Sequence, residues 1–263
     1  MSRVRIPFVL MAVFVFVVQT WVGVASHADE TQEAGHAAFL FVYRPKPGAE
    51  ALFEAAYRRH LDWHRRNSDP LPWYAWTVTS GPRVGLFVDG TFGIPFAALD
   101  RRVRPAEDAA DLAETAGTFA EMVERRICRL RPGLSTATPI ESGSPYAGTE
   151  ALEILVAPGA ERPFEDVLAT ATAAWKARAE RPAYTTYQVV TGSELPAYLI
   201  LLGRSGWAIY DHAEGSAWDL VLGASLDHGD RSARIRGLVR ELRSETWTYR
   251  PDLTLLRGGV PAQ

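Results

Sequence analysis

The sequence has 263 residues, of which 47% are hydrophobic and 22% are charged, and its formal net charge is −3. This composition is that of an ordinary globular protein and excludes a disordered chain. The sequence has no dense run of Lys and Arg interleaved with aromatic residues, so nucleic acid is excluded as an expected partner.

The first residues are typical of an export signal. Two arginines precede an uncharged apolar run over 7–18, and the small residues Ser26 and Ala28 stand at the spacing that signal peptidase recognises. We therefore expect residues 1–28 to be a signal peptide that is cleaved, leaving a periplasmic or secreted protein with no membrane span. The alternative is an uncleaved anchor, because apolar character continues past the run and approaches the roughly 20 residues that cross a bilayer.

The chain contains two similar halves. The sequence Arg-Pro-Gly-Leu-Ser at 131–135 recurs as Arg-Pro-Asp-Leu-Thr at 250–254, and a Pro-Gly pair precedes a helical segment at 47–48 and again at 158–159. We interpret these matches as a tandem duplication. The predicted parts are a first repeat over 37–135, a Ser-, Gly- and Pro-rich linker over 136–148, and a second repeat over 149–256.

The first half is predicted to contain strand, helix, strand, strand, helix and strand. Apolar residues between 49 and 66 recur at three- and four-residue steps, which is typical of an amphipathic helix. Ser80, Gly81 and Pro82 separate two β-branched and aromatic stretches, as in a hairpin. The predicted elements are strand 38–43, helix 49–66, strands 73–79 and 84–88, helix 106–123 and strand 127–131.

The second half repeats this order. Its predicted elements are strand 152–156, helix 162–178, strands 184–191 and 198–202, helix 230–243 and strand 246–250. A βαββαβ unit of this kind makes a four-stranded antiparallel sheet with both helices on one face. The other face is apolar, so we expect an α+β fold in which the two sheets bury their open faces against each other in an intrachain barrel.

The strand pattern, the short aromatic-centred segments at 96–100 and 207–211, and the Arg-Pro-x-Leu-Ser/Thr elements resemble the dimeric α/β-barrel (ferredoxin-like) superfamily over residues 38–254. The resemblance is to its NIPSNAP-like and uncharacterised bacterial members in particular. The superfamily includes antibiotic-biosynthesis-type monooxygenases, haem-degrading enzymes, haem peroxidases and chlorite dismutases, together with members of no known activity. The resemblance therefore implies a fold and leaves the function open.

His60 and His64 are the sharpest local feature of the sequence. Their spacing on a helix puts both imidazoles on one side, where they could bind a divalent metal or flank a haem. Counted from the Pro-Gly pairs, Ala171 and Trp175 fill the same positions in the second half, so the fold does not require the histidines. A pair of hydrogen-bonded, partly buried histidines is the favoured interpretation at this point, because the sequence alone reveals no third ligand.

Aromatic residues form the second candidate feature. Tyr74 and Trp76 point to one face of the predicted strand 73–79, and Tyr187 lies on the matching strand of the second half. Between two sheets these side chains would line a cavity suited to a flat apolar ligand. Ordinary core packing explains them equally well.

We therefore expect an exported protein that binds a small apolar molecule or an envelope protein through the barrel cavity or its rim. The candidate ligand-binding residues are His60, His64, Tyr74, Trp76 and Tyr187. The alternative is a monooxygenase or haem-handling enzyme with His60 and His64 near its reactive centre. The sequence leaves open whether the protein is an enzyme, whether it binds haem or a divalent metal, and whether it forms a homo-oligomer.

Three further residues are expected to have structural roles. Arg131 and Arg250 each precede a proline at a strand end, where pairing with a carboxylate would anchor that end. Cys128 is the only cysteine, so an exported chain has no internal disulfide. It corresponds to Trp247 on the inward side of the last strand, and we expect a buried, unreactive thiol.

Overall fold

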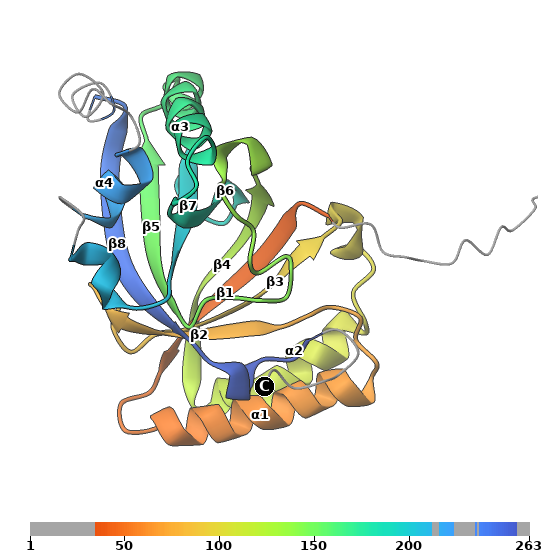
Figure 1. The fold of residues 1–263 in the computed structure, drawn as a ribbon. Helices are drawn as coiled ribbons and strands as arrows, with labels where there is room; N and C mark the ends of the chain where they lie inside the picture. Colours follow the sequence, from red (N-terminus) through yellow and green to blue (C-terminus); the bar gives the residue numbers. More distant parts are fainter. Residues whose placement is uncertain (1–34, 212–215, 224–234, 236, 257–263) are drawn as a thin grey trace, which may run out of the picture. The chain divides into compact units, whose positions relative to one another are not determined.

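The computed structural model describes residues 35–211, 216–223, 235 and 237–256. The expected signal peptide over 1–28 lies outside the described residues, and so does most of 230–238. Within the described residues, eight strands close into an antiparallel barrel and four α-helices lie outside it (Figure 1). None of the described helices is both long enough and apolar enough to cross a bilayer.

The two halves contain equivalent elements. The first has β1 (Ala37–Pro45), α1 (Glu50–Arg66), β2 (Tyr74–Ser80), β3 (Phe87–Ile94), α2 (Pro105–Glu114) and β4 (Ala120–Leu130). The second has β5 (Gly148–Val156), α3 (Glu161–Lys176), β6 (Ala183–Thr191), β7 (Ala197–Arg204), α4 (Ala217–Leu222) and β8 (Val239–Tyr249). The predicted aromatic-centred segments form two short 3₁₀ helices, η1 (Phe96–Ala98) and η4 (Trp207–Tyr210).

The strand order around the barrel is β1-β3-β2-β8-β5-β7-β6-β4, and β4 pairs again with β1. Each half contributes four strands in the same relative order, β4-β1-β3-β2 and β8-β5-β7-β6. The two halves are joined by the antiparallel pairs β2–β8 and β4–β6. The predicted α+β class and the barrel formed by the two sheets are confirmed.

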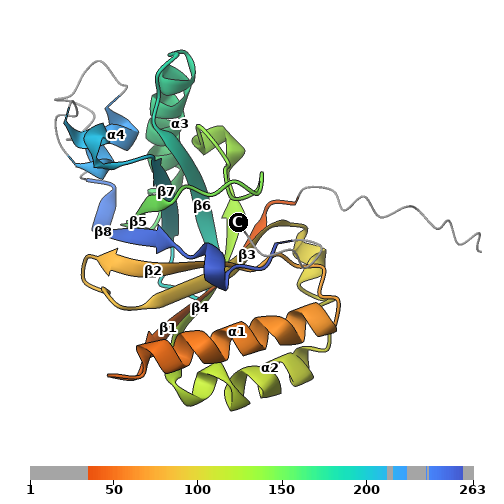
Figure 2. The same cartoon turned by 60° about the horizontal axis from the view of Figure 1, so that its bottom comes forward.

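The helices cover the outer faces of the strands. Figures 1 and 2 show α1 and α2 lying together beside the strands of the first half, while α3 and α4 lie beside those of the second. Because side chains alternate along a strand, Phe39 and Phe41 of β1 face outward and pack in one cluster with Phe53 and Tyr57 of α1. Outward-facing residues of β5 and β7 form the corresponding cluster with α3 and α4.

Inward-facing side chains fill the barrel. Trp76 and Trp247 are 1% and 0% exposed, and their ring centroids are 6.1 Å apart. Phe92 packs edge-on against both Trp76 and Tyr187, at 5.7 and 5.6 Å between centroids. Because these large rings occupy the space between the sheets, that space is a packed core, and binding of an apolar ligand there is not favoured.

Two segments cover the ends of this core. The linker places Ile140 in the core at 5% exposed, and the backbone carbonyl of Ile140 accepts a 2.9 Å hydrogen bond from the Tyr74 hydroxyl. At the opposite end, Arg83 in the β2–β3 hairpin reaches into the barrel. Its guanidinium pairs with one glutamate from each of three strands, Glu124 of β4 at 2.8 Å, Glu153 of β5 at 2.5 Å and Glu245 of β8 at 2.7 Å.

Two helix predictions were wrong at their C-terminal ends. Residues 120–123 belong to β4 and not to the helix predicted over 106–123, while 239–243 belong to β8 and not to the helix predicted over 230–243. The described helix of that part of the chain, α4, lies at Ala217–Leu222, before the predicted range. The reason is that these stretches are largely exposed ends of long strands. Glu121 pairs with Arg44 at 72% and 61% side-chain exposure, and Leu242 is 41% exposed, so a mixture of charged and apolar residues there resembled the solvated side of a helix.

The third strand was also placed too early. The prediction over 84–88 began at Val84, which is 63% exposed in the hairpin, whereas β3 continues to Ile94. Gly90 is needed inside this strand because a Cβ there would lie 2.7 Å from the backbone oxygen of Phe39 on β1.

Candidate metal site between the first two helices

His60 and His64 lie outside the barrel, on the buried face of α1, where they are 5% and 3% exposed. The next helix, α2, brings Asp108 and Asp111 to this face. These two carboxylates are three residues apart on a helix and therefore point to the same side. A His-x-x-x-His pair on one helix thus faces an Asp-x-x-Asp pair on the next.

Each imidazole is held through its Nδ1 atom by a carboxylate. His60 Nδ1 lies 2.8 Å from Asp111 Oδ2, and His64 Nδ1 lies 2.7 Å from Asp69 Oδ2. An ionised carboxylate only accepts hydrogen bonds, so we assign the hydrogen to Nδ1 in both rings. In a neutral ring the lone pair is then on Nε2, which is the arrangement of a histidine that binds a metal ion.

Both Nε2 atoms face the same carboxylate oxygen. Asp108 Oδ1 lies 3.4 Å from His60 Nε2 and 3.5 Å from His64 Nε2. These distances are too long for good N–H···O hydrogen bonds, which cluster near 2.9 Å. One ligand atom from each of His60, His64 and Asp108 lies within 4.8 Å of the other two, and all three residues are buried. The site therefore gathers three electron-rich atoms around a common point.

Asp69 is held firmly in its orienting position. Beyond His64, it accepts a 3.0 Å hydrogen bond from the backbone N–H of Leu71 and a 3.1 Å hydrogen bond from the indole N–H of Trp73. Burial acts to raise the pKa of Asp69, but the hydrogen bonds from His64, Leu71 and Trp73 outweigh it and hold this pKa below its ordinary value. Asp69 is thus kept as an anion that fixes the His64 ring.

The charge of the cluster favours a cation. Asp69, Asp108 and Asp111 bring three formal negative charges, and Arg102, which contacts Asp108 Oδ2, brings one positive charge. Burial lowers the pKa of His60, which favours its neutral form. With neutral imidazoles the formal charge is −2, so one divalent ion would neutralise the cluster. Two imidazoles and a carboxylate suit a divalent transition metal such as Zn²⁺.

Haem does not fit at these histidines. An axial histidine must present Nε2 to the open face of a porphyrin, but both Nε2 atoms here face Asp108. The two imidazoles are also enclosed by aromatic rings, with Trp63 and Trp73 at 5.2 and 4.9 Å from the His64 ring between centroids. A flat tetrapyrrole would have to displace α2 to reach either ring.

The five candidate residues from the sequence divide between two places. His60 and His64 lie in the layer between α1 and α2, whereas Tyr74, Trp76 and Tyr187 belong to the barrel interior. Sequence reasoning missed Asp69, Asp108 and Asp111, along with Arg102. The one available signal was the three-residue spacing of Asp108 and Asp111 in a predicted helix.

The second half joins its helices without histidines. Ala171, at the position of His60, is 1% exposed. Trp175, at the position of His64, donates its indole N–H to the backbone carbonyls of Leu220 and Val221 in α4, at 3.1 and 3.2 Å. An indole hydrogen bond therefore makes the helix–helix contact that the His–Asp cluster makes in the first half. The cluster is not a requirement of the fold.

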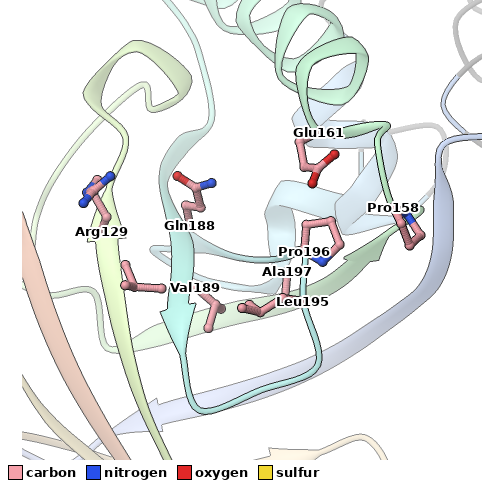
Figure 3. Close-up of a pocket in the computed structure, with 9 residues that line it drawn as sticks. Arg129, Pro158, Glu161, Gln188, Val189, Leu195, Pro196 and Ala197 are labelled. Carbon is pink, nitrogen blue, oxygen red and sulfur yellow. The ribbon is translucent and has the colours of Figure 1, made fainter.

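A separate pocket of about 510 Å³ opens beside the β6–β7 hairpin (Figure 3). Its wall includes Arg129 of β4, Gln188 of β6, Glu161 at the start of α3 and Leu195 of the hairpin. Arg129 and Leu195 are exposed, and the Arg129 guanidinium lies 5.2 Å from the centroid of the Phe96 ring. The described lining brings no buried polar groups together, so this pocket is a weaker candidate than the His–Asp cluster.

Known structures share the fold of this chain. An anthrone oxidase-like protein matches with a TM-score of 0.53 and 14% identity, over 88% of this chain and 98% of its own. A monooxygenase-like protein from Lactobacillus acidophilus matches with 0.53 and 10% identity, over 87% and 100%. A chlorite dismutase variant from Candidatus Nitrospira defluvii matches with 0.53 and 7% identity, over 83% and 92%.

These similarities show that the chain shares its fold with these proteins. No protein-family model matches the sequence, and no curated protein matches it either. At such low identity the similarity establishes the architecture, while the activity has to be argued from the site.

Proposed function

We propose that this chain is a metalloprotein of the dimeric α/β-barrel fold, in which His60, His64 and Asp108 bind one divalent transition-metal ion. The observation that carries the proposal is the convergence of two imidazole Nε2 atoms and one carboxylate oxygen, all buried and within 4.8 Å of one another. A buried group of three acceptors with no donor between them is costly unless a cation or protons occupy its centre.

The outer contacts support a metal over protons. Asp111 and Asp69 bind the Nδ1 atoms, as the outer carboxylates of carboxylate–histidine–metal sites do. If protons closed the network instead, each Nε2–H would be expected to approach Asp108 to hydrogen-bond distance, but the separations are 3.4 and 3.5 Å. The oxidase-like, monooxygenase-like and chlorite dismutase neighbours support an enzymatic function for the chain, and the proposal assigns the ion to that function.

We also infer export and duplication. The leader pattern over 1–28 supports a periplasmic or secreted location. The equal strand order of the two halves, together with the repeated Arg-Pro-x-Leu-Ser/Thr element, supports a NIPSNAP-like ancestor that was duplicated in tandem. On this proposal the first copy acquired or retained the histidines and the second copy has a plain packed helix pair.

The test is a Zn²⁺ titration of the purified chain after removal of bound metal with a chelator. We expect one Zn²⁺ per chain by native mass spectrometry and a raised melting temperature, because an ion that binds only the folded state stabilises it. Loss of a residue that only hydrogen-bonds a metal ligand typically weakens metal binding by about 10- to 100-fold. His60→Ala, His64→Ala and Asp108→Asn each remove a ligand itself, so each should weaken Zn²⁺ binding by more than this.

The matched controls are His36→Ala and Asp62→Asn. His36 immediately precedes β1, outside the two helices that hold the cluster, and the Asp62 side chain is 52% exposed on the same helix as the two histidines. Both variants should bind Zn²⁺ as the unaltered chain does. Circular dichroism identifies any variant that fails to fold. A folded, unaltered chain that takes up no Zn²⁺, Co²⁺, Mn²⁺ or Fe²⁺ would overturn the proposal.

A further inference from the structure

We infer that the bound ion is four-coordinate, with three protein ligands and one position left for water or a small exchangeable anion. The inference rests on the proposed metal site and concerns its coordination number and the origin of its fourth ligand. Structural zinc sites use four protein ligands, whereas catalytic zinc sites use three and keep one position open.

The distances between ligand atoms favour a tetrahedral arrangement. Metal–nitrogen and metal–oxygen bonds of about 2.0–2.1 Å at tetrahedral angles place two ligand atoms about 3.4 Å apart. Adjacent ligands of an octahedral ion with bonds of that length would be about 2.9 Å apart. The separations from Asp108 Oδ1 to His60 Nε2 and His64 Nε2 are 3.4 and 3.5 Å. Two of the three separations therefore match the edges of a tetrahedron, and the third, between the two imidazoles, lies within 4.8 Å.

The neighbouring carboxylates are already engaged. Asp111 and Asp69 bind the Nδ1 atoms on the far side of each ring, and Arg102 contacts the second oxygen of Asp108. Asp108 therefore offers one oxygen to the ion and not two. Within the described part of the chain, the cluster of potential metal ligands consists of the three named side chains. The fourth position of the tetrahedron falls to a ligand from solution.

The surroundings limit that ligand to a small one. His60, His64 and Asp108 are 5%, 3% and 7% exposed, so little of the cluster is in contact with solvent. The side chain of Asp111 is 23% exposed and marks the most open edge of the site. With the ligand side chains this buried, we expect water, azide or an anion of similar size to reach the ion, and not a bulky organic substrate.

Asp69 and Asp111 are positioning residues with unequal roles. Asp69 has a 5% exposed side chain and is held by Leu71 and Trp73 as well as by His64. Asp111 is more exposed and orients His60 alone. We expect Asp69→Asn to reduce Zn²⁺ affinity by about 100-fold and Asp111→Asn by about 10-fold. Glu107→Gln, a 62% exposed position on the same helix as Asp111, is the matched control and should have no effect.

The decisive experiment loads the chain with Co²⁺ in place of Zn²⁺ and records its visible spectrum. Four-coordinate Co²⁺ gives intense d–d bands, whereas six-coordinate Co²⁺ is nearly colourless. We expect intense bands that shift when sodium azide is added, because azide replaces the ligand from solution. Asp69→Asn should broaden or weaken the bands while the chain stays folded, an effect that a role in packing alone would not produce.

The outcomes separate the inference from the proposal beneath it. A chain that binds no Co²⁺ removes the metal site itself. A chain that binds one Co²⁺ with faint bands retains the metal site and overturns four-coordination. Intense bands that azide leaves unchanged show a position closed by a fourth protein ligand and overturn the open position.

Discussion

Arg250 binds both carboxylate oxygens of Glu54, at 2.5 and 2.8 Å, although 196 residues separate them. Arg250 follows the last strand of the second half, and Glu54 lies on the first helix of the first half. Arg131 makes the corresponding pair in the opposite direction, with Glu165 of α3. The predicted anchoring of both arginines by carboxylates is confirmed, and in each case the anchor joins one half of the barrel to the other.

The first prediction concerns these cross-half pairs. Arg250→Ala and Arg131→Ala should each lower the free energy of unfolding by about 1 kcal/mol, because the pairs are bidentate but partly screened by solvent. Urea unfolding measures this loss. Arg44→Ala removes an ion pair whose side chains are 61% and 72% exposed, and it should change little. Equal losses at all three positions would show that the pairs do not link the halves.

The same pairs should weaken in acid. Hydrogen bonding to Arg250 lowers the pKa of Glu54 below its ordinary value, and it lowers the pKa of Asp252 to about 2. A carboxylate with a lowered pKa stabilises the folded state above its unfolded pKa, and this contribution is lost as the pH falls. Below about pH 4, therefore, the difference between the unaltered chain and Arg250→Ala should shrink in urea unfolding. A difference that stays constant into acid would contradict the assignment.

The second prediction concerns Arg83 at the end of the barrel. Arg83→Ala would leave Glu124, Glu153 and Glu245 without their shared cation in a site where the Glu245 side chain is 0% exposed. Removing one partner of a buried ionic network typically costs about 3–5 kcal/mol, and we expect a loss of this size. Chemical unfolding of Arg83→Ala, Arg83→Lys and the Arg44→Ala control checks it. Arg83→Lys should recover part of the loss, since it restores the charge without the fork geometry.

The exposed ends of two long strands explain where the sequence was misleading. The Pro-Gly pairs, the hairpin turns and the Arg-Pro elements are local sequence signals. From them the two halves of the barrel and most of its strands could be predicted. The residues at 120–123 and 239–243 were assigned to helices because solvated strand ends that mix charged and apolar residues lack the usual apolar alternation. Glu121 lies opposite Arg44 of β1 and Leu242 lies opposite Ile154 of β5, pairings that only the folded chain brings together.

Only part of the candidate site could be predicted from the sequence, because some of its residues are neighbours along the chain and others meet only in the folded protein. His60 and His64 lie one helical turn apart, so local spacing revealed them. Asp108 and Asp69 come from segments before and after the intervening strands, and their approach depends on how α2 packs on α1. The barrel aromatics Tyr74, Trp76 and Tyr187 were equally visible in the sequence. Only their burial in a packed interior distinguishes them from lining residues of a cavity.

The third prediction concerns the thiol of Cys128. This residue is 0% exposed inside the barrel, and burial raises its pKa to about 12. The thiolate is the reactive form, so the folded chain at neutral pH should react with a thiol reagent such as dithionitrobenzoate only as fast as it unfolds. In guanidinium chloride the same thiol should react at once. Rapid labelling of the folded chain would contradict the packed interior.

The last prediction concerns Asp89 beneath α1. Asp89 is 3% exposed, and its Oδ2 accepts a 2.6 Å hydrogen bond from the Tyr57 hydroxyl. Its Oδ1 is buried and has no hydrogen-bond partner among the described residues. Burial raises the pKa of Asp89 from 3.8 to about 7, so the folded state keeps a proton that the unfolded chain has already lost. Between these two values, stability should therefore fall as the pH rises.

Asp89→Asn should remove this dependence, because an amide retains the acceptor for Tyr57 and carries no charge to bury. Its gain in unfolding free energy over the unaltered chain should be small near pH 4 and should grow to at most about 4 kcal/mol above pH 7. Urea unfolding at both ends of this range, with a chelator present to exclude metal binding, measures the gain. Asp62→Asn, at a 52% exposed position on α1, controls for the general effect of removing an aspartate. If Asp89→Asn were less stable than the unaltered chain above pH 7, Asp89 would have to be an ion with a partner, and the proton assigned to it would be wrong.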